Sequence, residues 1–261
     1  MQIKRALVTG AGRRIGRAMA IYLAERGFDV AVHYASSADA AAVVAGQIRG
    51  MGRTAATLPA DLLDEAQVRP LVGQAAEALG GPISVLVNNA SIFEHDTVGS
   101  LTRESWDRHI ESNLRAPVVL AEAFAAQAPR ALIDELGEPV AQALVVNMID
   151  QRVRKLTPEF MSYTIAKMGL WAFTRTAAQA MAPHVRVNAI GPGPTVQGHR
   201  QTAEHFARQR AATVLNRGAD ETDITAALGY LLDARAVTGQ LLCVDGGQHL
   251  GWRTPDIQGP E

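Results

Sequence analysis

Short apolar runs rich in β-branched residues alternate along the whole chain with longer, alanine-rich amphipathic stretches. The short runs are typical of buried strands, and the long stretches, whose apolar positions recur once per helical turn, are typical of helices. Because strict alternation returns the chain to the same end of the sheet after every helix, it predicts parallel strands covered on both faces. We therefore expect one α/β domain of Rossmann type, a doubly wound parallel sheet of about seven strands.

This pattern assigns each expected element to a range of residues. Strands are expected at 6–9, 30–33, 54–58, 85–88, 143–147, 186–189 and 241–244. Helices are expected near 17–26, 38–50, 65–79, 104–127, 161–181 and 222–232. The segment 128–139 shows neither period and is expected to be an irregular connection.

Length and composition set the limits of this interpretation. A chain of 261 residues with 48% apolar content can fill one full-sized core, and no linker divides it, so residues 1–248 are expected to be one domain followed by a tail at 249–261. The net charge of −1 and the lack of a basic face argue against nucleic acid and membrane surfaces as partners. The sequence goes from Met1-Gln2 straight into an expected strand, so no signal peptide is expected, and the single Cys243 cannot form an internal disulfide. A cytoplasmic location and no metal site are expected.

A glycine-rich turn, TGAGRRIG at 9–16, follows the first expected strand and opens the first expected helix. Gly10, Gly12 and Gly16 permit a tight turn and a close approach of the backbone to phosphate oxygens, while the helix N-terminus adds free N–H groups and partial positive charge. In isolation such a turn is an ordinary strand-to-helix connection. At the start of an alternating series it predicts a dinucleotide site.

The end of the second strand indicates which dinucleotide binds. Sites that prefer NAD place a carboxylate there for the ribose 2′-OH, whereas this chain has His33-Tyr34-Ala35-Ser36-Ser37 and no acid. His33, the two serines and Arg13 are candidates to bind a 2′-phosphate, so NADPH is expected rather than NADH. A solvated strand end for His33 and a helix cap for the serines are the alternatives. Asp61 suits either the adenine end of the cofactor or a helix cap.

Tyr163 and Lys167 are four residues apart in an expected helix, so both side chains lie on one helical face. An adjacent ammonium is expected to favour the phenolate and to lower the pKa of the tyrosine. The chain uses arginine for nearly all of its 25 cations, with lysine only at Lys4, Lys155 and Lys167. The lysine at 167 is therefore expected to have a role that a guanidinium does not fill.

Five motifs follow one another along the chain: the glycine turn, Asn88-Asn89-Ala90, Asn113, the Tyr163/Lys167 pair and Gly191-Pro192-Gly193. In type and order they resemble those of the short-chain dehydrogenase/reductases over nearly the whole chain. The resemblance implies that Tyr163 is the proton donor, that Lys167 binds the nicotinamide ribose and that Asn113 holds a water of a proton relay. It also implies a homotetramer assembled through the helices at 104–127 and 161–181.

Together, the residue patterns and this resemblance give one expected set of cofactor contacts. They are Gly10, Gly12, Arg13, Arg14, Ile15, Gly16, His33, Tyr34, Ser36, Ser37, Asp61, Leu62, Asn89, Ala90, Ser91, Lys167, Gly191, Pro192 and Gly193.

Two departures from the common family pattern resemble its pteridine reductase branch. Arg14 replaces the middle glycine of the turn, and Asp150 replaces the serine expected thirteen residues before the tyrosine. The resemblance to this branch implies that Arg14 lies near pyrophosphate and substrate and that Phe93 stacks on a pterin. Ser91, Phe93, Arg14, Asp150 and Tyr163 are therefore the expected substrate contacts.

The chemistry of a pterin explains these departures. Reducing a C=N bond requires protonation of a ring nitrogen, and a carboxyl with a pKa raised by burial can serve as the acid or relay. The expected function is NADPH-dependent reduction of a dihydropterin or dihydrofolate. A general carbonyl or 3-oxoacyl reductase and a non-catalytic NADPH sensor are the alternatives. Phe93 as a core residue and Asp150 as a turn cap are the corresponding structural alternatives.

The segment 195–207 is polar, irregular and placed at the carboxyl edge of the sheet, so it is expected to be the substrate lid. The tail at 249–261 includes Trp252, which is expected either to reach a neighbouring subunit's site or to pack on its own subunit.

Overall fold

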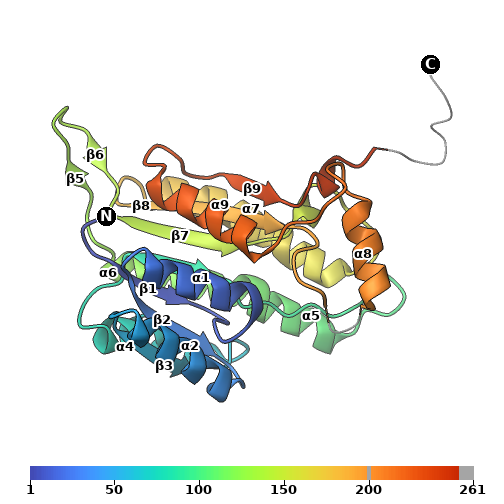
Figure 1. Ribbon diagram of the computed structural model, residues 1–261, viewed down its shortest axis with the longest axis horizontal. Helices are drawn as coiled ribbons and strands as arrows, with labels where there is room; N and C mark the ends of the chain where they lie inside the picture. The colour runs from blue at the N-terminus through green and yellow to red at the C-terminus, as the bar shows by residue number, and fades with distance from the viewer. Residues whose placement is uncertain (199–200, 253–261) are drawn as a thin grey trace.

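The computed structural model describes residues 1–198 and 201–252 of the chain. Its seven parallel strands pair in the order β3-β2-β1-β4-β7-β8-β9 (Figure 1). The strands are β1 Arg5–Val8, β2 Asp29–Tyr34, β3 Ala55–Pro59, β4 Val85–Asn88, β7 Ala143–Met148, β8 Val185–Pro192 and β9 Leu241–Val244. The strand order reverses between β1 and β4, which is where ligands bind in doubly wound folds. The predicted seven-stranded fold is confirmed.

Helices cover both faces of this sheet (Figure 1). On one face lie α1 Arg14–Glu25, α2 Ala38–Gly50 and α9 Glu221–Asp233, and on the other lie α3 Glu65–Val68, α4 Leu71–Ala78, α6 Ala116–Gln127 and α7 Met161–Ala180. Successive strand residues belong to opposite cores, since Ala6 and Val8 face the first and Leu7 faces the second. Burial on both faces explains why the strands are continuous apolar runs.

Proline accounts for two breaks in expected helices. The expected helix at 104–127 is divided into α5 Arg103–Ile110, the π-turn η1 Glu111–Arg115 and α6. Pro117 has no N–H to donate to the carbonyl of Asn113, four residues earlier, and its ring crowds that carbonyl, so the helix widens there. Pro70 likewise separates α3 from α4.

Two segments expected to be irregular contain regular structure. Within 128–139 and just beyond it, β5 Leu132–Ile133 and β6 Pro139–Val140 form an antiparallel hairpin that projects from the edge of the molecule near the N-terminus (Figure 1). In the expected lid, α8 Ala203–Ala211 begins after Thr202, whose side chain accepts from the His205 N–H. Two short 3-10 turns, η2 Gln151–Val153 and η3 Gln248–Leu250, lie close to each other.

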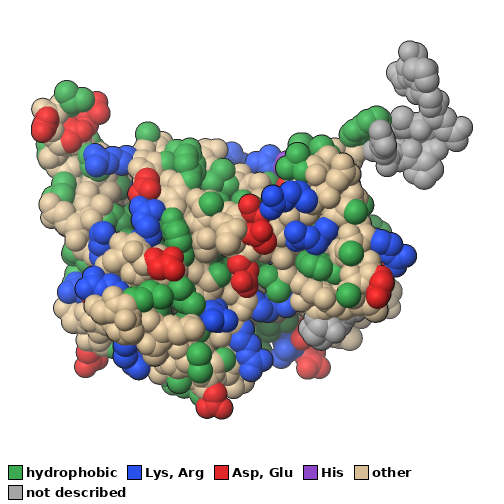
Figure 2. All heavy atoms as spheres, in the orientation of Figure 1, with side chains coloured by type: hydrophobic (Ala, Val, Ile, Leu, Met, Phe, Trp, Pro, Cys, Tyr) green, Lys and Arg blue, Asp and Glu red, His purple; other side chains and the backbone are tan. Residues whose placement is uncertain are grey.

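Acidic and basic side chains are interspersed over the face shown in Figure 2. Among the described residues, no helix has the length and apolar character needed to cross a membrane.

Candidate active site

The expected site residues meet at the carboxyl edge of the sheet, because they follow the ends of parallel strands. At the reversal point Asn89 joins β1 to β4: its Nδ2 donates to the Thr9 carbonyl at 2.8 Å, and its N–H donates to Thr9 Oγ1 at 2.9 Å. The Ala90 N–H donates to the same hydroxyl at 3.0 Å. The glycine turn and the segment after β4 therefore form one rigid unit.

The Tyr163/Lys167 pair lies over the end of β7, as its spacing predicts. Tyr163 Oη donates to Asp150 Oδ2 at 3.0 Å, and Lys167 Nζ donates to the Met148 carbonyl at 2.8 Å. Lys167 Nζ is 5.6 Å from the centre of the Tyr163 ring. Both side chains are buried, at 5% and 2% exposure. Asp150, Tyr163 and Lys167 thus form one cluster at the base of the site.

Burial, more than the charges of neighbouring groups, determines the acidity of this cluster. It lowers the pKa of Lys167 to about 8 and raises the pKa of the Asp150 carboxyl, which is enclosed by protein although the residue as a whole is partly exposed. Burial and then the Asp150 charge raise the pKa of Tyr163 well above its ordinary value. The prediction that Lys167 lowers the tyrosine pKa is wrong, because burial and the neighbouring carboxylate outweigh any effect of the ammonium.

Asp150 also caps a turn, which was the expected alternative to a role as acid or relay. Its Oδ1 accepts from the Arg152 N–H at 2.8 Å and caps η2, while Oδ2 accepts from Tyr163. The cap fixes the carboxyl in the direction of the tyrosine, so the two roles are compatible.

Asn113 lies in the π-turn and is fully buried. Its Oδ1 accepts from the Ile92 N–H and its Nδ2 donates to the Ile92 carbonyl, both at 2.8 Å. The side chain therefore anchors the loop that carries Phe93. That Asn113 holds a water of a proton relay remains a prediction. Pro117 has no N–H to donate to the main-chain carbonyl of Asn113, so this carbonyl oxygen is the atom that suits such a water.

Phe93 is not a core residue, since 42% of it is exposed. Its ring stacks on Phe160, with centroids 4.2 Å apart and planes 9° apart, and meets Tyr163 edge-on at 4.7 Å. The Ser91 side chain acts to lower the pKa of Tyr163. An aromatic surface therefore lies directly beside the proton-bearing groups.

The glycine turn has the features of a phosphate cradle. Helix α1 has no side-chain N-cap and no acid in its first turn, so its N-terminal N–H groups and positive dipole are open to an anion. Gly10 has φ +62°, and a Cβ on Gly16 would lie 2.2 Å from the Gly10 carbonyl oxygen. The exposed Arg13 adds a cation at the same place. These residues fit a dinucleotide pyrophosphate.

The structure contradicts the assignment of His33 to the 2′-phosphate. Its ring is 1% exposed; Nδ1 accepts from the Gly10 N–H and Nε2 lies 3.0 Å from the Ala60 carbonyl oxygen, to which it donates. Burial lowers the pKa of this histidine and favours the neutral ring. His33 therefore supports the glycine turn from behind and presents neither nitrogen to a ligand.

The other expected residues at the adenosine end differ in exposure. Ser36 is exposed, Tyr34 and Ser37 are half-buried, and Ser37 Oγ lies 3.1 Å from where a Cβ on Gly12 would be, so this serine borders the turn. Asp61 is exposed and its Oδ1 accepts from the Leu63 N–H at 3.0 Å, while Asp64, not Asp61, caps the following helix. Leu62 packs into the core.

Arg14 connects the glycine turn to the lid. Its guanidinium donates to the carbonyls of Val196 and Gln197 at 3.0 and 2.7 Å, and its φ of 53° lies in the left-handed region. Gly193, just before the lid, approaches Asp245 so closely that a Cβ on it would lie 2.6 Å from the Asp245 Cβ. Of the expected lid, residues 199 and 200 lie outside the described chain.

Arg152 and Phe160 were not predicted as site residues. The Arg152 guanidinium lies 5.1 Å from the centre of the Phe160 ring, and its charge acts to lower the pKa values of Asp150 and Tyr163. A cation two residues after the expected acid was the available sequence signal for Arg152. Phe160 gave none, since its contact with Phe93 joins distant segments.

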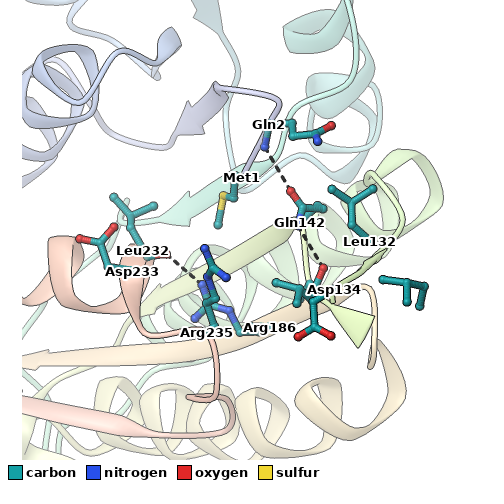
Figure 3. A pocket seen from close by; sticks show the side chains of 12 residues that line it. Met1, Gln2, Leu132, Asp134, Gln142, Arg186, Leu232, Asp233 and Arg235 are labelled. Atoms are coloured by element: carbon teal, nitrogen blue, oxygen red, sulfur yellow. Dashed lines mark hydrogen bonds between the residues drawn. The ribbon is translucent and has the colours of Figure 1, made fainter. Parts of the chain in front are cut away.

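A recess of about 520 Å³ lies apart from this cluster, near the N-terminus and the hairpin (Figure 3). Leu132, Gln142, Arg186 and Arg235 are among its lining residues. It lies at the edge of the sheet where the strands begin and contains none of the expected site residues.

The raised pKa of Asp150 predicts how stability depends on pH. Because the folded-state pKa lies above the unfolded value, the stability that Asp150 contributes is complete below its ordinary pKa and is lost as pH rises through the folded pKa. Asp150→Asn removes this titration. The variant should therefore gain stability relative to the unmodified protein as pH rises from acidic to neutral, measured by urea unfolding across that range. A stability difference that does not change with pH would contradict the assignment.

Known proteins are similar to this chain over nearly its whole length. Residues 10–249 match a family model described as enoyl-(acyl carrier protein) reductase. The 3-oxoacyl-[acyl-carrier-protein] reductase FabG of Staphylococcus aureus (strain Mu50 / ATCC 700699) is 30% identical over 95% of this chain and 98% of its own length.

Two similar solved structures were determined with a nicotinamide cofactor. FolM alternative dihydrofolate reductase 1 from Brucella canis, complexed with NADP, is 46% identical with a TM-score of 0.90, and the match covers 98% of this chain and 97% of that one. The landomycin C-6 ketoreductase LanV with bound NADP and rabelomycin is 29% identical with a TM-score of 0.82, covering 95% and 97%. The fold, the sequence motifs and these matches together show that the chain belongs to the short-chain dehydrogenase/reductase family.

Proposed function

We propose that this chain is an NADPH-dependent reductase of pterin-type C=N bonds, acting on a dihydropterin or dihydrofolate. The observation that carries the proposal is the hydrogen bond between Tyr163 and Asp150, a carboxyl in the place where the family commonly has serine. The exposed Phe93 ring beside Tyr163 supports a flat substrate. The 46% identity to proteins named alternative dihydrofolate reductase supports the same substrate class.

The two acidic groups suit protonation of a ring nitrogen. Bound NADPH supplies the hydride, and this chain must supply a proton. Burial favours the protonated form of Asp150, which can then donate to Tyr163 Oη while the tyrosine hydroxyl proton turns toward the substrate nitrogen. Asp150 then holds the negative charge in place of the tyrosine. Because Tyr163 has a high pKa, a carboxyl that replaces its proton makes it a more effective donor.

A carbonyl or 3-oxoacyl reductase is the second candidate. It is favoured by the match to the 3-oxoacyl reductase and by the family description. The carboxyl at Asp150 argues against it, since a neutral hydroxyl is enough to donate to a carbonyl oxygen. A non-catalytic NADPH sensor is disfavoured because Tyr163, Lys167 and Asn113 are all present.

The deciding experiment measures NADPH oxidation against dihydropterins, dihydrofolate, quinones and β-keto thioesters. Tyr163→Phe should lower kcat by about 10²–10⁴, the usual contribution of a general acid, while NADPH still binds. Asp150→Ser should depress dihydropterin reduction more than carbonyl reduction. Near-normal turnover by Tyr163→Phe, or equal losses on both substrate classes by Asp150→Ser, would refute the assigned roles.

Cofactor preference is tested at Ser37 rather than at the buried His33. An aspartate at Ser37 would repel a 2′-phosphate, so Ser37→Asp should weaken NADPH binding at least about tenfold and narrow its advantage over NADH. Val43→Asp, which adds an acid at an exposed position in α2, the helix that follows Ser37, is the matched control and should leave the preference unchanged. Calorimetric titration of both variants with each cofactor measures the effect. Tighter binding of NADH by the unmodified protein would overturn the proposal.

Substrate class is tested at Phe93. Phe93→Ala should weaken flat substrates by about 1–3 kcal/mol, the scale of one lost stacking surface, and small aliphatic ketones much less. Because the ring is partly exposed, the free energy of unfolding should fall by less than the roughly 3–5 kcal/mol expected for a buried phenylalanine. Val98→Ala, an exposed apolar truncation that follows in the same loop, is the control. Equal losses on flat and aliphatic substrates would contradict a stacking role.

A further inference from the structure

Three polar side chains next to the site form a buried hydrogen-bond chain that the proposed chemistry does not use. Ser162 Oγ donates to the Asp96 carboxylate, and the Ser162 N–H donates to the same group at 3.2 Å. His109 Nδ1 lies 2.6 Å from Ser162 Oγ. Asp96, His109 and Ser162 are each at most 1% exposed. Burying three such groups is costly unless every donor and acceptor is paired.

The neighbouring contacts show which group donates in each of these hydrogen bonds. The Glu94 N–H donates to His109 Nε2 at 3.0 Å, so that nitrogen carries no proton. Burial lowers the pKa of His109 and favours the neutral ring, so its single proton is on Nδ1 and is donated to Ser162 Oγ. The serine proton is then free for Asp96. This order is opposite to that of a nucleophilic triad, in which the histidine accepts from the serine.

The hydrogen-bond chain of Asp96, Ser162 and His109 holds the loop that carries Phe93. Alternate residues of 92–96 are held from the interior: Ile92 by Asn113, Glu94 by His109 and Asp96 by Ser162. The residues between them, Phe93 and His95, both contact the Phe160 ring, stacked at 4.2 Å and edge-on at 5.1 Å respectively. The Phe160 N–H in turn donates to the Asp96 carbonyl at 2.8 Å.

The same chain also touches the proton donor. Ser162 directly precedes Tyr163 in the first turn of α7, and the His109 ring meets the Tyr163 ring edge-on with centroids 6.0 Å apart. One set of buried contacts therefore fixes both the aromatic surface and the tyrosine relative to each other.

We propose that Asp96, Ser162 and His109 are positioning residues that hold Phe93 at a fixed place beside Tyr163 for a flat substrate. The inference rests on the proposed function for the substrate class, but the geometry it concerns is independent of which flat molecule is reduced. The inference predicts that disrupting these hydrogen bonds changes the preference among substrates and not the stability of the protein alone.

The test is Ser162→Ala, which removes one acceptor from the His109 ring and one donor from Asp96. We expect the KM for dihydropterins and for menadione, a flat quinone, to rise about tenfold, the equivalent of a weakened stacking surface. The KM values for NADPH and for an aliphatic β-keto thioester should stay near those of the unmodified protein. Ser84→Ala is the matched control, because Ser84 is an equally buried serine at the opposite edge of the sheet, bonded to the Ile3 carbonyl. It should cost stability without changing the ratio of KM values.

Asp96→Asn provides a second variant that keeps the size of the side chain, and an intermediate rise in the KM for flat substrates is expected. Equal changes for flat and aliphatic substrates, or none in a folded Ser162→Ala protein, would overturn the positioning role. If the unmodified protein reduces no dihydropterin, the proposed function fails. The ratio of KM values for menadione and the thioester then still decides the positioning role.

Discussion

The single direction of the strands is the constraint on which the rest of the structure depends. In a parallel sheet every strand ends at the same edge, so the segments after β1, β4, β7 and β8 meet there although they are far apart in sequence. The end of β7 illustrates the result. The Met148 carbonyl binds Lys167 and Asp150 binds Tyr163, so two hydrogen bonds fix α7 over the strand end. The fold itself therefore holds Tyr163 and Lys167 in place.

The same architecture sets the chemistry of the pair. Desolvation is the largest influence on Asp150, Tyr163 and Lys167 alike, and in each case it disfavours the charged form. A carboxyl in water would lose its proton well below neutral pH, and it could not act as an acid there. Enclosure against α7 lets it keep that proton more readily. In the proposed function, the buried position of Asp150, and not its residue type alone, is what suits it to replace a hydroxyl.

Sequence predicted what depends on local spacing and on direct succession along the chain. Alternating apolar runs predicted the sheet, and the four-residue interval placed Tyr163 and Lys167 together. It could not predict that His33 is buried, because the partners of its ring, Gly10 and Ala60, come from the ends of two other strands. The break in the helix at Asn113 could have been predicted from Pro117, because proline has no N–H to donate to the carbonyl four residues earlier.

The buried chain beside the site was beyond sequence reasoning for the same reason. Asp96 and Ser162 are 66 residues apart, and His109 and Ser162 are 53 residues apart, so no local period marks them. A buried aspartate, serine and histidine read one at a time are ordinary polar residues. Only the folded chain shows that their donors and acceptors match and that they surround Phe93 and Tyr163.

Arg14 shows how a departure from a family pattern can carry its own physical reason. In the left-handed region a glycine costs nothing, whereas an arginine is strained there by about 1–3 kcal/mol. Strain of this size persists only where the surroundings hold the residue in place. Here the guanidinium makes two hydrogen bonds to the carbonyls of Val196 and Gln197, which a glycine cannot make. The arginine therefore gives up the unstrained backbone of a glycine and gains two hydrogen bonds that join the glycine turn to the segment after β8.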